Sequence, residues 1–184
     1  MRHLSLLLIL MLAACMGGGG GGNAGGTLSE RPPDDNVTDP GSLPTSGTAR
    51  YAGDLTARLP LGPGGTRQVH SGDMVLNVDF GATRDQVTGR VTGLAPAQGT
   101  PLDGSLRIAS GRIFRDTDPD QNYTFNAGLG GRLARGSDRF VIDGKLAGEF
   151  RGRDRGRVTG VVYGDITGPA GEDIFDGDFA ASRD

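Results

Sequence analysis

The stretch that decides the fold runs from Gly144 to Gly168 and reads GKLAGEFRGRDRGRVTGVVYGDITG, with glycine at every fourth position. A helix with this spacing would carry a stripe of small residues, as membrane helices do, but the arginines and acids between the glycines exclude a membrane helix. In a strand, residues four apart lie on one face, and Leu146 and Val162 share that face with the glycines. Small residues that alternate with large ones on an inner face are typical of a narrow closed barrel.

Shorter runs with a period of two lie on both sides of this stretch. In the clearest, Asp73–Phe80, the side chains of Met74, Leu76 and Val78 lie on one face and polar side chains on the other, which predicts a half-buried strand. Clusters of Gly, Pro, Asp and Ser, which are turn residues, separate the runs. Eight strands are therefore expected, with the fourth able to continue to Phe114: Thr48–Leu55, Asp73–Phe80, Asp85–Val91, Leu102–Ala109, Asn122–Leu133, Arg139–Phe150, Arg157–Asp165 and Asp173–Ala181.

These strands predict an all-β domain over residues 47–184, an eight-stranded antiparallel soluble β-barrel. A domain of about 138 residues can bury roughly two thirds of its surface. A transmembrane barrel would need an apolar outer band with aromatic girdles, whereas the predicted outer faces of these strands are charged. An open sandwich of the same strands is the alternative.

The composition limits the fold further. Of the 184 residues, 34 are Gly and 10 are Pro, and aromatic residues make up 5%. This much glycine disfavours a helical bundle, because each Gly in a helix costs about 1 kcal/mol relative to Ala. The net charge of −3 indicates no particular partner. Lys145 is the only Lys, so almost all positive charge is carried by Arg.

The first residues have the pattern of an exported bacterial lipoprotein. A basic start precedes an apolar run from Leu4 to Leu12, which is too short to span a bilayer and indicates a signal peptide in residues 1–14. The motif LAAC that ends at Cys15 resembles the lipobox, which implies cleavage before Cys15 and acylation of its thiol, and several acyl chains anchor a protein stably. Met16 is not the Asp associated with inner-membrane retention, so the resemblance favours the outer membrane. An ordinary signal peptide with an unrelated Cys is the alternative.

Residues 15–46 are expected to form an acylated, disordered tether. Gly17–Gly22 is an unbroken run of glycine, and residues 31–44 are rich in Pro and Asp. About 30 residues of this composition form a coil whose ends lie roughly 30 Å apart. The predicted organisation is thus a signal peptide, a Gly/Pro-rich tether and a barrel that begins at Gly47.

Four parts of the barrel region have a recognisable pattern: Gly47–Gly53, Leu76–Phe80 with Val87–Gly89, Leu146–Gly152, and Gly168–Glu172 with Gly177–Phe179. They resemble segments of the barrel domain of transferrin-binding protein B and of related surface lipoproteins such as factor H-binding protein. The closing pair departs from the family pattern at Ala170, Gly171 and Asp176. The resemblance implies a barrel on a surface lipoprotein with a protein or iron-carrier ligand. Known members carry a second lobe or subdomain where ligand contacts often lie, so the resemblance bears on fold and display more than on transferrin binding.

The sequence offers little for catalysis. Once the signal is removed, His70 is the only His, and it is expected in an exposed turn beside Ser71 and Gly72, where it would not serve as a catalytic base. A zinc site lacks ligands, and no cofactor is expected. An enzyme that uses carboxylates alone, such as a glycan hydrolase, remains an alternative.

One acidic segment carries Asp at every second position, as the loops that bind calcium do. Its candidate ligands are Asp116, Asp118 and Asp120. However, Gln121 stands where such a loop needs Gly, and Ala127 stands where it needs a bidentate Glu. Calcium is therefore the weaker interpretation, and a solvated hairpin turn is the stronger one.

A basic segment lies in the turn between the sixth and seventh expected strands. It could contact an anionic ligand or an acidic partner, because Arg binds anions bidentately. An exposed charged turn without a ligand is the alternative. The four candidate residues are Arg151, Arg153, Arg155 and Arg157.

Together these features predict a non-enzymatic binding module that is anchored to the outer membrane by lipid at Cys15 and displayed on the cell surface. A host or environmental protein, or an iron-carrier, is the expected partner, and nucleic acid is not expected. A structural envelope lipoprotein that faces the periplasm is the alternative function. The oligomeric state does not follow from the sequence.

Overall fold

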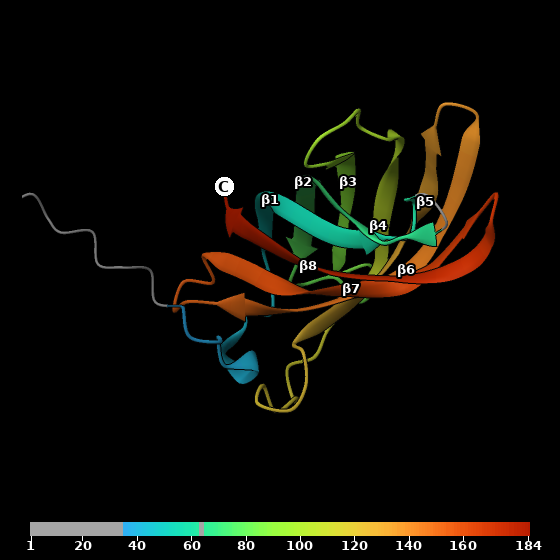
Figure 1. Ribbon diagram of the computed structural model, residues 1–184. Helices are drawn as coiled ribbons and strands as arrows, with labels where there is room; N and C mark the ends of the chain where they lie inside the picture. Colours follow the sequence, from blue (N-terminus) through green and yellow to red (C-terminus); the bar gives the residue numbers. More distant parts are fainter. Residues whose placement is uncertain (1–34, 63–64) are drawn as a thin grey trace, which may run out of the picture. The chain divides into compact units, whose positions relative to one another are not determined.

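The computed structural model describes residues 35–62 and 65–184, in which eight antiparallel strands form a closed barrel (Figure 1). Each strand pairs with the next along the chain, and β8 pairs back with β1. A three-residue 3-10 helix, Pro40–Ser42, precedes β1. The strands are β1 Thr48–Leu59, β2 Gln68–Asp79, β3 Val87–Pro96, β4 Asp103–Ile113, β5 Phe125–Arg135, β6 Asp138–Arg151, β7 Arg157–Gly168 and β8 Gly171–Arg183.

The predicted fold class is confirmed, because the pairing of β8 with β1 closes the sheet. That pairing runs from Tyr51 opposite Arg183 to Arg58 opposite Asp176, and it excludes an open sandwich. All eight expected strands are present, and most are longer than expected. No helix in the described part of the chain has the length and hydropathy that a membrane crossing requires.

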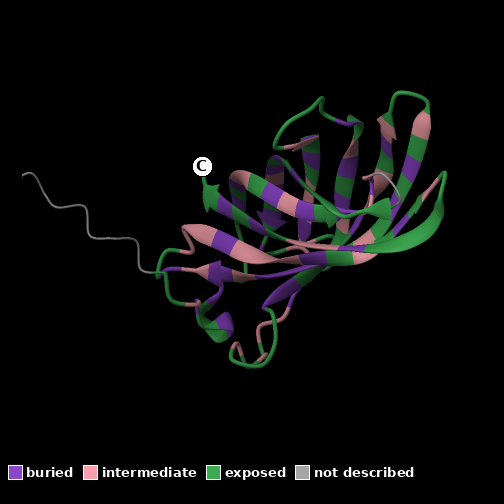
Figure 2. Cartoon of the chain, in the orientation of Figure 1, coloured by how far each residue is buried: buried purple, intermediate pink, exposed green. Residues whose placement is uncertain are grey.

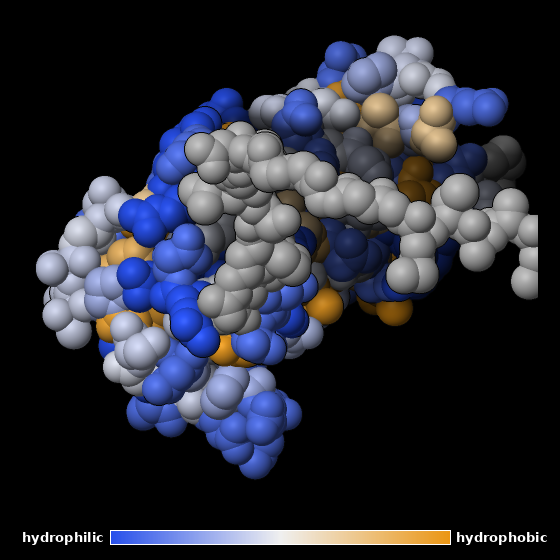
Figure 3. Space-filling model, turned by 90° about the vertical axis from the view of Figure 1, so that its left-hand side faces the viewer, coloured by the Kyte–Doolittle hydropathy of each residue, from blue (hydrophilic) through white to orange (hydrophobic). Residues whose placement is uncertain are grey.

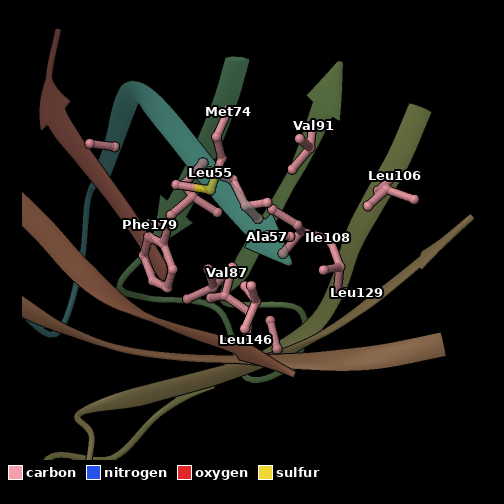
Figure 4. Close-up of a cluster of buried hydrophobic side chains, with 14 of the residues drawn as sticks. Leu55, Ala57, Met74, Val87, Val91, Leu106, Ile108, Leu129, Leu146 and Phe179 are labelled. Atoms are coloured by element: carbon pink, nitrogen blue, oxygen red, sulfur yellow. The ribbon is translucent and has the colours of Figure 1, made fainter. Parts of the chain in front are cut away.

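Side chains that point into the barrel form one hydrophobic core. Buried and exposed residues alternate along the strands (Figure 2), as the period of two predicts. Leu55, Met74, Val91, Ile108 and Leu129 come from five different strands, are buried, and point toward one another inside the barrel (Figure 4). The interior is therefore filled by side chains, as in other barrels of eight strands.

The glycine series lies on the inner faces of β6 and β7 and makes room for aromatic rings from β8. Gly148 of β6 lies opposite Gly160 of β7, and Gly160 in turn lies opposite Phe179 of β8. A Cβ atom on Gly148 would lie 2.7 Å from the Phe179 ring. Coverage of glycine by an aromatic ring is a device that stabilises sheets. The same arrangement recurs four residues along the strands, with Gly144, Gly164 and Phe175.

The up-and-down order of the strands gives the barrel two different ends. We call them the terminal end, which carries residues 35–47, the C terminus and the β2–β3, β4–β5 and β6–β7 connections, and the loop end, which carries the other four connections. In Figure 1 the C terminus and the β6–β7 turn lie at the left, and the β5–β6 and β7–β8 turns lie at the right. The described surface that faces the viewer in Figure 3 is mostly hydrophilic, with small hydrophobic groups between the polar ones.

Residues 35–46, which the sequence assigns to the disordered tether, are ordered and pack on the terminal end. Val37 forms a β-bridge with Arg151, at the end of β6, and Leu43 is buried in the core. The expected start of the ordered domain at Gly47 is thereby corrected, because Leu43, which precedes it, supplies part of the core. Residues 15–34 lie outside the described residues.

We expect Gly148→Ala to destabilise the barrel and Gly128→Ala not to. A Cβ atom at Gly148 would lie 2.7 Å from ring atoms of Phe125 and Phe179, and overpacking of a core costs about 1–3 kcal/mol. Gly128 points outward, and no atom lies nearer than 3.5 Å to an added Cβ there, so alanine only restricts the unfolded chain. Thermal unfolding by circular dichroism should show a melting temperature several degrees lower for Gly148→Ala alone. Equal melting temperatures would contradict this packing.

Candidate functional site

Two of the four arginines of the β6–β7 turn hold the N-terminal segment on the barrel. Arg157 Nη1 donates to Asp35 Oδ1 at 2.8 Å, and Arg151 Nη1 donates to the Asp35 carbonyl at 2.9 Å. Arg151 also donates to Glu149 Oε2 at 3.0 Å and to Thr159 Oγ1 at 2.7 Å. These two side chains are thus bound by the chain itself, and the expected contact of the turn with an anion or a partner stays a prediction.

Tyr51 of β1 fixes the same turn from inside the barrel. Its side chain is fully buried, and its hydroxyl donates to the Arg155 carbonyl at 3.0 Å. Burial raises the pKa of Tyr51 to about 12, so the hydroxyl keeps its proton at neutral pH and remains a donor. Arg155 has a φ of 59°, in the left-handed region, and the hydrogen bond holds this strained residue in place. Arg153 is exposed in the same turn.

The three acids of the β4–β5 loop do not converge on one point. Asp118 accepts hydrogen bonds from the Asp120 N–H at 3.0 Å and from Gln121 Nε2 at 2.8 Å, so its carboxylate shapes the turn. Within the described residues, no three His, Cys, Asp or Glu side chains are grouped as metal ligands. The calcium interpretation of Asp116, Asp118 and Asp120 stays a prediction.

His70 lies inside the barrel, and the expectation of an exposed turn is wrong. It belongs to β2, is only 1% exposed, and its Nδ1 lies 3.1 Å from the Gln68 carbonyl oxygen. The error arises because β2 begins at Gln68, five residues before its expected start at Asp73. Burial lowers the pKa of His70, so the fold favours the neutral imidazole.

We expect the stability of the barrel to fall as the pH drops below about 6.5, in part through His70. The folded state disfavours the charged imidazole, whereas the unfolded chain takes up a proton at the ordinary pKa, so protonation favours unfolding. Denaturant unfolding at neutral and mildly acidic pH measures this dependence. In His70→Leu the difference between the two conditions should shrink. A difference as large as in the unaltered chain would assign the effect to other groups.

A hollow of about 470 Å³ opens on the outer surface of β6, β7 and β8. Gly144, Gly164 and Phe175 contribute to its lining, so it lies over the same glycine pair that accommodates the Phe175 ring inside the barrel. We call it the β6–β8 hollow. Its other lining residues come from outward positions and are Asp143, Lys145, Tyr163, Asp165, Ile174 and Asp176.

Large apolar side chains are exposed at this hollow. Ile174 is 58% exposed and Tyr163 is 48% exposed, and Val141 on β6 is exposed on the same side of the sheet. Tyr163 and its cross-strand neighbour Lys145 also line a second hollow under the β4–β5 loop, beside the exposed Tyr123. Contiguous exposed apolar side chains with a polar rim mark interaction sites.

Two of the acidic side chains at the β6–β8 hollow face each other across neighbouring strands. Asp143 lies directly opposite Asp165, and like charges at opposite positions destabilise a sheet. Within residues 35–62 and 65–184 neither carboxylate forms an ion pair. Asp176, in contrast, pairs with Arg58 and Arg67, and the hydrogen bond from Arg58 lowers the pKa of Asp176. A partner that brings a cation to Asp143 and Asp165 would relieve their repulsion.

A further hollow, of about 390 Å³, lies at the loop end. Arg135 lines it, but its Nη1 donates to the Leu61 carbonyl at 2.6 Å, and its guanidinium lies over the Phe140 ring, 5.8 Å from the centroid. The chain itself therefore holds this cation. The β6–β8 hollow, with unpaired charges beside exposed apolar side chains, is the stronger candidate for binding.

The sequence places Asp143, Lys145, Tyr163 and Asp165 on an outer face but gives them no role. The feature of the sequence that could have indicated this site is Tyr163, a large aromatic residue at an outward position among charged residues. What brings them together with Ile174 is the register of three strands, which no local pattern encodes.

Comparison with known proteins gives a likeness among solved structures. No model of a protein family matches the chain, and no curated protein matches it. Among solved structures, the chain is similar to a single-residue mutant of the vaccine antigen transferrin-binding protein B from Haemophilus parasuis Hp5, with a TM-score of 0.45 and 15% identity. The match covers 80% of this chain and 28% of that protein. No ligand follows from this likeness.

Proposed function

We propose that this chain is a non-enzymatic binding module, anchored by lipid at Cys15 to the outer membrane and displayed on the cell surface, that holds a protein or an iron-carrier. The observation that carries the proposal is the β6–β8 hollow with Tyr163 and Ile174 exposed at its edge. Because the barrel interior is filled by side chains, its outer surface and loops are what the domain offers to a partner.

A protein is the partner that this surface fits best. Tyr is enriched among the residues that anchor protein interfaces, and the hollow beside Tyr163 and Ile174 can receive an apolar side chain. The unpaired carboxylates of Asp143 and Asp165 would attract a basic group. We therefore expect the bound segment to combine an apolar side chain with an Arg or Lys.

The chemistry of the barrel supports binding over catalysis. His70, the one His outside the signal, is buried and favoured in its neutral form, so it packs in the core and does not face a substrate. The cationic groups of Arg151 and Arg157 hold Asp35. The β6–β8 hollow presents exposed apolar side chains with charged side chains around them, an arrangement that suits recognition.

The anchor and the location rest on the LAAC motif that ends at Cys15. The ordered domain leads toward this residue from its terminal end, where Val37 is bound to β6. Residues 16–34 separate the two, and their Gly- and Pro-rich composition suits a tether.

Capture of a partner by the intact lipoprotein should depend on the β6–β8 hollow. We expect Tyr163→Ala and Ile174→Ser to weaken capture about 30-fold, because loss of an interface anchor costs about 2 kcal/mol or more. Val69→Ser is the matched control, since Val69 is 53% exposed on β2, away from the hollow. The captured protein is quantified by mass spectrometry. Equal capture by all three variants would place binding elsewhere.

Surface display is tested on intact cells that produce the lipoprotein. We expect added protease to remove the barrel from these cells, and Cys15→Ser to release it from the membrane fraction. Resistance of the chain in intact cells, with cleavage after the outer membrane is opened, would contradict display. That result would favour the alternative of a structural envelope lipoprotein that faces the periplasm.

A further inference from the structure

The outer face of β3, β4 and β5, which we call the arginine face, carries positive charge that the proposed function does not use. These strands contain five arginines and one acid, Asp103, although the whole chain has a net charge of −3. Arg90 lies directly opposite Arg107 across β3 and β4, a placement that destabilises a sheet unless a counter-charge is present. Arg112 and Arg132 are exposed on the neighbouring positions of β4 and β5.

The side chains of the arginine face have no partner in the described chain. Among residues 35–62 and 65–184, no ion pair or side-chain hydrogen bond involves Arg90, Arg107, Arg112 or Arg132. Arginines on other strands are paired, as with Arg58 and Asp176. The guanidinium groups of this face are therefore available to an external anion, and a guanidinium binds phosphate bidentately.

These arginines are spread over the convex outer surface of three adjacent strands of the closed barrel and do not surround a pocket. Strands lie about 4.8 Å apart and residues rise about 3.4 Å along a strand, so the register spreads the four side chains over roughly 10 by 20 Å. Beside Arg107 the outer face of β5 presents Gly128 and Gly130, which have no side chain. The large hydrophobic side chains exposed in the described chain all lie outside β3, β4 and β5.

We propose that the arginine face docks on a membrane surface that bears anionic phosphate headgroups. An open array of separate guanidinium groups matches a surface of separate phosphates, whereas one small anion requires groups that converge on it. The lack of exposed large hydrophobic side chains on these three strands disfavours a protein interface, whose centre is apolar. Each arginine near such a surface strengthens binding about 5-fold.

Docking through this face would turn the β8 edge of the β6–β8 hollow away from the membrane, whereas Asp143 of β6 lies opposite Gly130 of β5, beside the arginine face. In a closed ring of eight strands, β4 and β8 are four positions apart in both directions, so they lie on opposite sides of the barrel (Figure 1). When Arg107 on β4 faces the membrane, Ile174 on β8 faces outward. The headgroup contact goes beyond the proposed function, and only the nearness of a membrane rests on the proposed anchor at Cys15.

Vesicle binding by residues 15–184 with Cys15→Ser tests the docking, since this chain lacks the acyl anchor and keeps the whole described barrel. It is sedimented with vesicles of phosphatidylcholine alone or of phosphatidylcholine with phosphatidylglycerol. We expect binding only where phosphatidylglycerol is present, and weaker binding as salt rises. The triple variant Arg90→Gln, Arg107→Gln, Arg132→Gln should bind roughly 100-fold more weakly.

The matched control replaces Arg50, Arg58 and Arg67 with Gln, which changes the net charge equally but removes only arginines that are ion-paired. It should bind like the parent chain, and circular dichroism verifies that both variants are folded. Equal loss in the two variants, or no binding of the parent chain to the anionic vesicles, would overturn the proposal. Tighter binding to a soluble anionic polysaccharide than to the vesicles would assign the face to a glycan. Partner capture through Tyr163 is a separate measurement, so failure of vesicle binding leaves the proposed function standing.

Discussion

The packing of the Phe175 and Phe179 rings against the glycine pairs of β6 and β7 is the constraint on which the barrel depends. Both rings come from β8, the strand that must also pair with β1 to close the sheet. The Phe179 ring contacts Phe125, with centroids 6.3 Å apart, and Phe125 in turn contacts Phe150 at 5.2 Å. A side chain at Gly148 would therefore displace a connected group of aromatic rings, and the closing strand would shift with them.

The barrel is closed and its interior is filled by side chains, so partners meet its outer surface. The two long sides of that surface differ in chemistry. On the side of β8, exposed apolar side chains stand beside the opposed Asp143 and Asp165. On the side of β4, the opposed Arg90 and Arg107 stand among glycines and polar side chains. Like charges at opposite positions cost stability in both places, and such local conflicts are expected where a surface serves function. One side suits a protein partner and the other a plane of phosphates.

The parts of the fold that could be predicted are those that local periodicity encodes. Alternation along Asp73–Phe80 and the glycine series from Gly144 to Gly168 were sufficient for eight strands and an inner face of small residues. His70 was misplaced because the first residues of β2 read QVHSG, which has more turn character than strand character. The order of residues 35–46 was missed because few of them are apolar, and Leu43 alone reaches the core. The candidate surfaces depend on register between strands, which pairs Asp143 with Asp165 and is not visible in either segment alone.

A double-mutant cycle on Gly148 and Phe179 tests most directly whether the glycine pairs make room for the rings. The free energy of unfolding is measured for Gly148→Ala, Phe179→Leu and the double variant. Because the smaller Leu removes the contact of 2.7 Å with the Phe179 ring and leaves those with Phe125 and the Thr159 carbonyl oxygen, we expect the double variant to be more stable than the sum of the single effects predicts, by about 1 kcal/mol. Strict additivity of the two substitutions would contradict a central role for the contact between Gly148 and the Phe179 ring.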